Sequence, residues 1–80
     1  MVEIRYFAAI ADAVGKDSET LALPAGATVA DLRATLSATY GPDLEKMLSV
    51  CAYLIGDELT RDPTAALSPR VDVLPPFAGG

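Results

Sequence analysis

Residues 28–42, TVADLRATLSATYGP, decide the fold. Thr28 and Asp31 have the spacing of a capping box, in which the threonine accepts a hydrogen bond from the first helical turn and the aspartate lies at the positive end of the helix dipole. Gly41 and Pro42 end the helix, because glycine can adopt the left-handed cap and proline cannot continue the helical hydrogen bonds. The segment therefore predicts one main helix. Its buried face consists of apolar side chains at helical spacing: Val29, Leu32, Leu36 and Tyr40.

Two strands are predicted before this helix. Residues 2–7 alternate between core-facing and outward-facing positions, which places the aromatic Phe7 on the face away from the core. Residues 18–23 predict a second strand that pairs antiparallel with the first. The alanine-rich residues 8–14 between the two strands predict a short helical turn.

After the main helix, the sequence predicts a short helix over residues 42–49 and an apolar strand over residues 50–55. A short strand over residues 58–60 and a last strand over residues 70–74 follow, the latter with Asp72 and Leu74 directed away from the core. The compact arrangement of these elements is an α+β fold, a mixed sheet of four to five strands packed on one main helix. With the first and last strands as parallel neighbours, this is the ubiquitin-like β-grasp architecture.

The last residues of the sequence predict an extended arm. Two prolines favour an extended path, and the glycines at the tip pack nothing and fit a channel too narrow for other residues. Six residues could reach up to ~20 Å beyond the domain. We interpret residues 1–74 as the domain and residues 75–80 as a carrier arm that presents the Gly80 carboxylate to another protein's active site. A frayed terminus is the alternative interpretation.

Composition excludes several classes of function. The 80 residues are enough for one small domain, and the net charge of −5 argues against binding to nucleic acid or to anionic membranes and favours a basic partner surface. A single cysteine, Cys51, and no histidine argue against a disulfide and against a zinc site, and they indicate a reducing, cytoplasmic compartment. No apolar run is long enough to span a membrane, and the first residues do not read as a signal peptide.

Three segments of the sequence carry a family resemblance: RYFA at 5–8, LPAGATVADL at 23–32 and VLPPFAGG at 73–80. With these segments the chain resembles the small, sulfur-carrying subunit of molybdopterin synthase, in the family shared with the thiamine-pathway sulfur carrier. The tail motif is the most specific of the three. Two turns depart from the family pattern: residues 68–70 (SPR) replace an Asp-Gly-Asp turn, and Gly56 and Asp57 stand where the family often has an asparagine.

The resemblance implies that Gly80, with Gly79 before it, is the reactive end of the chain. An ATP-dependent activating enzyme would convert the carboxylate into an acyl-adenylate, and a sulfur donor protein would replace AMP to leave a thiocarboxylate. The large subunit of the synthase would then transfer this sulfur to a cyclic pterin phosphate precursor, within a heterotetramer of two small and two large subunits. The chain itself is expected to be non-catalytic, with no tightly bound cofactor and no metal.

Apolar residues predicted to lie outside the core suggest where a partner docks. Phe7 and Leu74 fall on the same face of the sheet if the first and last strands are neighbours, and the tail starts beside them. The alternative is that these side chains are scattered singly, as is normal for protein surfaces. The predicted partner-binding residues are Phe7, Leu59, Leu74, Pro75, Pro76, Phe77 and Ala78.

Other functions remain open from the sequence alone. The sulfur could be delivered to thiamine or cysteine biosynthesis, although the Pro-Pro-Phe segment before Ala78 favours the pterin pathway. A ubiquitin-like protein modifier would need the same Gly-Gly chemistry, and a plain β-grasp interaction module would not use its carboxylate. Cys51 lies in an apolar segment and is interpreted as a buried core thiol. The three tyrosines Tyr6, Tyr40 and Tyr53 are interpreted as core or core-edge residues.

Overall fold

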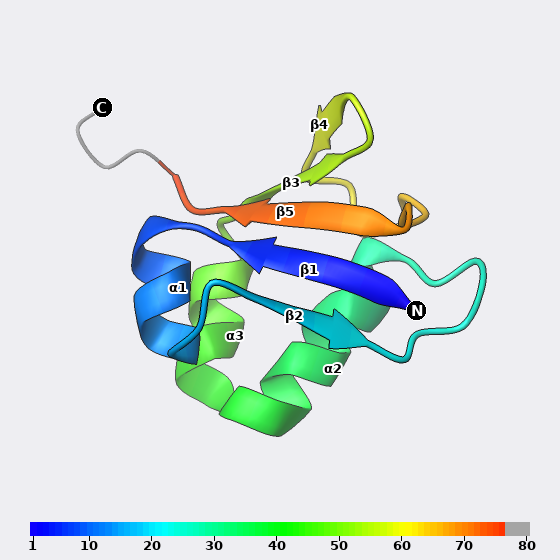
Figure 1. The fold of residues 1–80 in the computed structure, drawn as a ribbon. Helices are drawn as coiled ribbons and strands as arrows, with labels where there is room; N and C mark the ends of the chain where they lie inside the picture. Colours follow the sequence, from blue (N-terminus) through cyan, green and yellow to red (C-terminus); the bar gives the residue numbers. More distant parts are fainter. Residues whose placement is uncertain (77–80) are drawn as a thin grey trace.

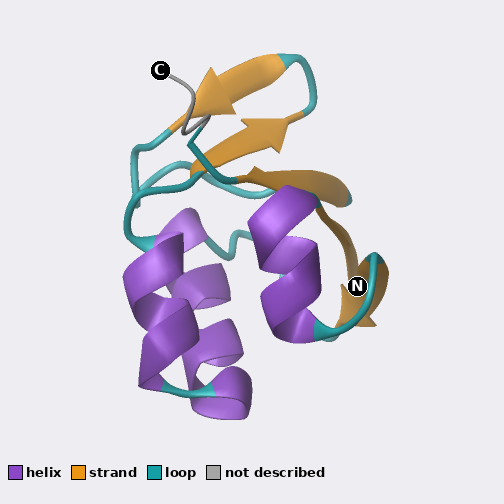
Figure 2. Cartoon of the chain, turned by 90° about the vertical axis from the view of Figure 1, so that its left-hand side faces the viewer, coloured by secondary structure: helices purple, strands orange, loops and turns teal. Residues whose placement is uncertain are grey.

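In the computed structural model, residues 1–76 are described, and they form one mixed sheet with three helices on one of its faces (Figures 1 and 2). The strand order is β2-β1-β5-β3-β4, and β1 and β5 are parallel. This is the β-grasp architecture that the sequence predicts. The elements are β1 (Val2–Tyr6), α1 (Ala8–Val14), β2 (Ser18–Leu21), α2 (Val29–Tyr40), α3 (Pro42–Leu48), β3 (Ala52–Ile55), β4 (Glu58–Thr60) and β5 (Arg70–Leu74).

The parallel pair β1 and β5 forms the centre of the sheet. Ile4 lies beside Val71 and Tyr6 beside Val73, and all four side chains are buried against the helices. The residues between them in β1 are less buried, so the period-two alternation predicted for this strand is confirmed. The centre of the sheet therefore supplies one wall of the core.

Helix α2 supplies the opposite wall and begins as its sequence predicts. Thr28 Oγ1 accepts a hydrogen bond from the Asp31 N–H at 3.3 Å, and Asp31 Oδ2 accepts one from the Thr28 N–H at 2.9 Å. The capping box is thus closed in both directions. Three of the predicted stripe residues are buried and the fourth, Tyr40, is partly buried. The helix ends at Gly41, whose φ of 97° lies in the region that favours glycine.

Two shorter helices accompany the main helix α2, and the predicted short helix over residues 42–49 is confirmed as α3. Residues 8–14 form the helix α1 rather than a short turn, and α3 packs beside α2. Ile10 and Val14 lie one helical turn apart in α1 and are both buried, so α1 closes one side of the core. The helix stops at Gly15, whose φ is 85°.

Three strands are shorter than predicted. Strand β1 ends at residue 6 because Phe7 is the N-cap residue of α1, and hydrogen bonds explain the other two differences. The N–H groups of Val50 and Cys51 donate to the carbonyls of Met47 and Leu48, which continues the last turn of α3 and delays β3 until residue 52. Val50 is consequently 51% exposed. In β2, the N–H of Leu23 donates to the Leu21 carbonyl, and the strand ends at residue 21.

Candidate functional site

The face of the sheet that no helix covers holds the candidate site. In its middle, Arg5 on β1 forms a bidentate ion pair with Asp72 on β5, with Nε–Oδ1 at 2.8 Å and Nη2–Oδ2 at 3.1 Å. Asp72 faces away from the core as predicted, yet it is buried because Arg5 lies against it. The hydrogen bond and the charge of this aspartate raise the pKa of the Arg5 guanidinium. The middle of the open face is therefore polar and internally paired.

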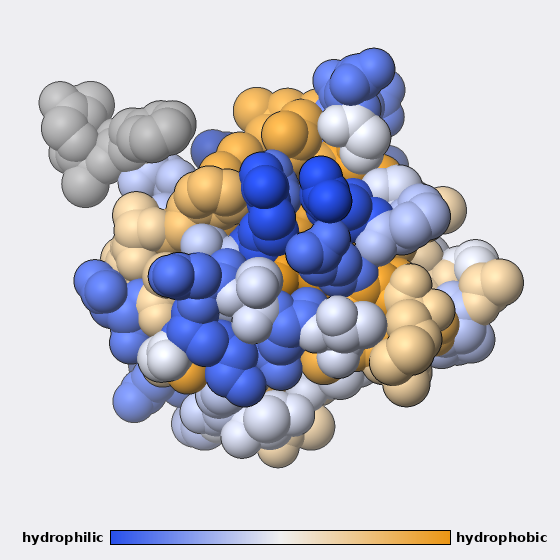
Figure 3. Space-filling view, viewed as in Figure 1, coloured by the Kyte–Doolittle hydropathy of each residue, from blue (hydrophilic) through white to orange (hydrophobic). Residues whose placement is uncertain are grey.

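Towards the end where the described chain stops, the open face becomes apolar. The antiparallel ladders place Leu54 beside Leu59 and Ala52 beside Leu74. A cavity of about 370 Å³ opens here, which we call the tail-base cavity. It is lined by Ala52, Leu59, Arg61, Leu74, Pro75 and Pro76. Figure 3 shows apolar surface near this end of the molecule and hydrophilic surface over its middle. Two of the predicted docking residues, Leu59 and Leu74, thus share one cavity with the start of the tail.

Phe7 lies at the same end of the sheet but lines a different hollow. It follows β1 in extended conformation, with φ −131° and ψ 147°, and acts as the N-cap residue of α1 without a side-chain capping bond. The guanidinium carbon of Arg5 is 5.4 Å from the centroid of its ring, within the range of a cation–π contact. Phe7 is 36% exposed. Together with residues of α1 and the α1–β2 turn, it borders a hollow of about 420 Å³.

The tail itself is only partly described. The ladder of β5 ends at Leu74, whose partner is Ala52, and Pro75 and Pro76 follow without N–H groups. This agrees with the expectation that prolines cannot continue the ladder. Four predicted site residues lie outside the described residues, and their roles stay predictions, as does the boundary between domain and arm at residue 75: Phe77, Ala78, Gly79 and Gly80.

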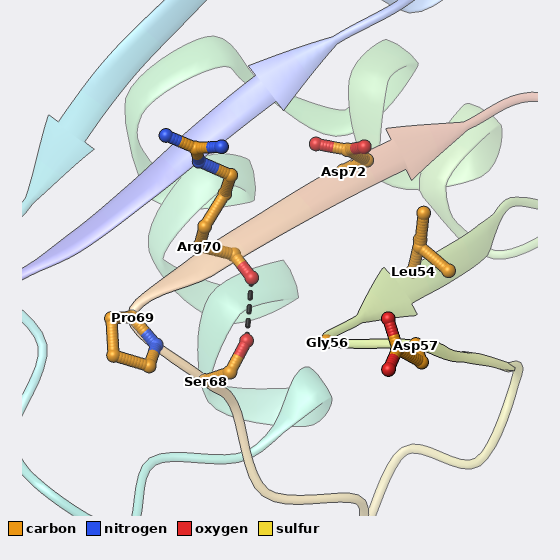
Figure 4. A pocket seen from close by; sticks show the side chains of 7 residues that line it. All are labelled: Leu54, Gly56, Asp57, Ser68, Pro69, Arg70 and Asp72. Atoms are coloured by element: carbon orange, nitrogen blue, oxygen red, sulfur yellow. Dashed lines mark hydrogen bonds between the residues drawn. The ribbon is translucent and has the colours of Figure 1, made fainter.

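The two turns that depart from the family pattern lie together on the open face. They border a hollow of about 390 Å³ near the start of β5 (Figure 4). Figure 4 shows Asp57 across this hollow from Arg70, with Leu54 on the same side as Asp57. Arg70 Nε donates to Glu3 Oε1 at 3.0 Å, and Ser68 Oγ donates to the Arg70 carbonyl at 2.5 Å. Sequence reasoning found both turns but not their proximity, which depends on the pairing of β5 with β3.

Sequence reasoning missed a polar cluster at the edge of the core. Glu19 on β2 accepts hydrogen bonds from the hydroxyls of Tyr6 and Tyr40, the latter at 2.8 Å, and Lys16 Nζ is 3.7 Å from its other oxygen. Burial alone would raise the pKa of Glu19, but the two tyrosine bonds and the lysine charge together lower it below its ordinary value. Burial and the bond to Glu19 raise the pKa of both tyrosines. The sequence did hold a signal for this cluster: Glu19 lies two positions before the core-facing Leu21 in the same strand, so its side chain points to the same face.

Cys51 is a buried core thiol, as predicted. Its Sγ donates to the Met47 carbonyl at 3.2 Å, and burial raises the pKa of the thiol to about 11. The neighbouring Tyr53 is also buried and donates to the Leu48 carbonyl at 2.8 Å. Within residues 1–76, no three histidine, cysteine, aspartate or glutamate side chains are grouped as metal ligands. In the same range, no helix has the length and apolar composition to cross a membrane.

Comparison with protein families matches nearly the whole chain to one model. The matching model is described as the ThiS family, and the match covers residues 4–80. A comparison with curated proteins finds no match.

Solved structures resemble the fold over nearly its full length. SAMP1 of Haloferax volcanii is 20% identical with a TM-score of 0.73, over 99% of this chain and 98% of that one. The HVO 2177 protein of Haloferax volcanii is 29% identical with a TM-score of 0.76, over 99% of this chain and 85% of that one. A Pyrococcus furiosus protein described as molybdopterin converting factor, subunit 1, is 23% identical with a TM-score of 0.76, over 95% and 97% of the two chains. These likenesses establish the β-grasp fold.

Proposed function

This chain belongs to the ThiS family of ubiquitin-like sulfur carriers, and from that premise we propose that it carries sulfur on Gly80 for molybdenum cofactor biosynthesis. The family match reaches residue 80, so it includes the Gly-Gly end. The Pro-Pro-Phe segment at residues 75–77 and the likeness to a molybdopterin converting factor subunit favour the pterin pathway. The chain serves as the carrier, and the large subunit of the synthase supplies the active site.

The chemistry rests on changing the leaving group at the Gly80 carbonyl. A carboxylate is a poor acceptor for sulfur because oxide is a poor leaving group. In the activating enzyme, a Gly80 carboxylate oxygen attacks the α-phosphate of ATP and pyrophosphate leaves, which produces an acyl-adenylate. A donor that supplies sulfur at the oxidation level of sulfide then attacks the acyl carbon, and AMP leaves. The resulting thiocarboxylate sulfur is a better nucleophile than the original oxygen and displaces an oxygen substituent of the pterin precursor in the large subunit. Water then cleaves the acyl–sulfur bond, which leaves the sulfur on the precursor and restores the Gly80 carboxylate.

The observation that carries this proposal is the position of the tail on the fold. The ladder of β5 ends at Leu74, and the two prolines lead the chain away beside the tail-base cavity on the face that no helix covers. We therefore expect a protein that takes up residue 80 to contact this end of the open face. The apolar lining there, with Leu59 60% exposed, is the kind of surface that a partner buries.

The test is the intact mass of the protein after incubation with ATP, an activating enzyme and a sulfur source. We expect the mass to rise by the exchange of one oxygen for one sulfur, and this increase to disappear when the large subunit and the pterin precursor are added. Deletion of Gly80 should abolish both changes and leave the fold intact, because residue 80 follows the last strand. Normal product formation by the truncated protein would contradict the carrier role.

A second candidate is the sulfur carrier of thiamine biosynthesis, because the matching family is shared with that carrier. The same mass experiment separates the two pathways. The protein that carries the thiocarboxylate is divided into two samples. One sample receives the pterin-synthase large subunit with its precursor, and the other receives the thiazole-forming enzyme with its substrates. The pathway is the one whose enzyme removes the sulfur from Gly80.

A further inference from the structure

Arg61 is an unusual lining residue for an apolar docking surface. Within residues 1–76, ion pairs join Arg5, Lys16, Arg33 and Arg70 to carboxylates, whereas Arg61 and Lys46 have no such pair. Of these two, Arg61 lines the tail-base cavity, together with Leu59, Leu74 and the two prolines. An exposed guanidinium thus stands at the point where the tail leaves an otherwise acidic protein of net charge −5.

The sheet register explains why Arg61 stands there. Tyr53 pairs with Thr60, and Ala52, the residue before Tyr53, pairs with Leu74. Arg61 follows Thr60 and therefore comes beside Ala52, on the side opposite Leu74. Strand parity puts Arg61 on the same face as Leu59, two positions earlier. The guanidinium therefore borders the apolar side chains from the side of β4.

A partner that buries the tail-base cavity would need a negatively charged group opposite Arg61. A partner that covers Leu59 and Leu74 also removes water from Arg61, and an unpaired charge in a dry interface is costly. A carboxylate offsets this cost best, because the guanidinium fork can donate two parallel hydrogen bonds to it. In the hollow near the start of β5, by contrast, the guanidinium of Arg70 is already paired with Glu3, so the cation there has its carboxylate within the chain.

We propose that Arg61 in the tail-base cavity binds a carboxylate side chain of the protein that receives the tail, and thereby selects partners with an acidic residue at the entrance to their tail channel. The inference rests on the proposed function, since it needs a protein that takes up the tail. It differs from the basic partner surface that the overall charge favours. The partner would instead be locally acidic at the tail base, whatever the charge of the rest of its surface.

The test uses titration calorimetry to measure how tightly the carrier without sulfur binds two receiving proteins, the pterin-synthase large subunit and the activating enzyme. Arg61→Glu should weaken binding to the partner that carries the acidic residue by roughly 30-fold or more, because it replaces a buried pair with two like charges. Arg61→Gln should have an intermediate effect. Lys46→Glu, the same charge change on a helix at the covered face, is the matched control and should stay within about twofold of the native affinity.

A charge swap completes the test. Acidic residues at the channel entrance of the partner are changed singly to arginine, and one of these variants should bind the Arg61→Glu carrier better than the native partner does. Equal affinity of the native and Arg61→Glu carriers, or an equal loss with Lys46→Glu, would overturn the inference while the proposed function stands. If the native carrier binds neither receiving protein, the proposed function fails and the inference fails with it. Circular dichroism of each variant checks that the fold is retained.

Discussion

On the covered face of the sheet, Ile4, Val71 and Val73 are fully buried under the helices, whereas on the open face Leu59 is 60% exposed. Both faces derive from the same strands through period-two alternation, but the apolar side chains of the open face lie towards one end, beside a polar middle. The difference is that the chain's own helices cover one face and nothing in residues 1–76 covers the other. The comparison teaches that the covered face sets folding stability and that the open face is available for binding.

The largest expected effect lies on the covered face. Ile4→Ala removes a fully buried side chain from the central strand and leaves a cavity against the helices. We expect the free energy of unfolding to fall by about 2–5 kcal/mol, measured by urea denaturation. Leu59→Ala on the open face is the matched control and should change stability by less than about 0.5 kcal/mol. Similar losses from the two variants would break the distinction between the faces.

An intermediate effect is expected at the edge of the covered face, where Glu19 bonds to Tyr6 and Tyr40. Its pKa is lower in the folded protein than the ordinary value of 4.5. The native state therefore binds this proton less readily than the unfolded chain does. The stability that this difference provides is present above about pH 4.5 and is lost as the pH falls through the folded pKa.

Glu19→Gln should lower stability by about 1–2 kcal/mol at neutral pH and should remove part of the loss on acidification. Urea denaturation at a series of pH values between neutrality and pH 3 provides the measurement. A variant with the same acid dependence as the native protein would show that other carboxylates account for that dependence. The Tyr6 and Tyr40 hydroxyls would then serve only to hold β2 in place.

The smallest effect on stability is expected at Phe7. Phe7→Asp removes an exposed ring, but it introduces a good N-cap residue at the start of α1, where no side chain caps the helix. The two contributions oppose each other, so we expect a net change within about 0.5 kcal/mol. Affinity for the receiving protein should nevertheless fall in titration calorimetry. Unchanged affinity would remove Phe7 from the docking surface, and unfolding would mean that its ring supports α1.

The two faces also differ in how well the sequence predicts them. The cap at Thr28, the stripe of α2 and the parity of β1 depend on local spacing, and all three are confirmed. Ile10 and Val14 have the spacing of one helix face, but the alanines around them add no further hydrophobic periodicity. The sequence therefore predicted only a short helical turn where the structure has the helix α1.

The candidate site was harder to predict because it depends on contacts between segments far apart in the chain. Phe7 and Leu74 were found by parity, and Leu59 was predicted as an extension of their patch. The structure shows that Leu59 and Leu74 share a cavity and that Phe7 does not. Arg61 follows a three-residue strand, and its place beside the tail depends on the register of β3 with both β4 and β5. The sequence alone does not encode that register in any local pattern.

The parallel pairing of β1 with β5 has a consequence for the synthesis of the protein. Arg5 and Asp72 are 67 positions apart in the sequence, yet they lie side by side at the centre of the sheet. During translation, β1 cannot pair with its central neighbour until residues 70–74 have left the ribosome, and contacts of such long range form late. A chain that stops before residue 70 lacks the strand that joins β1 to β3. Incomplete translation products should therefore remain unfolded, and they cannot compete with complete carriers for the receiving protein.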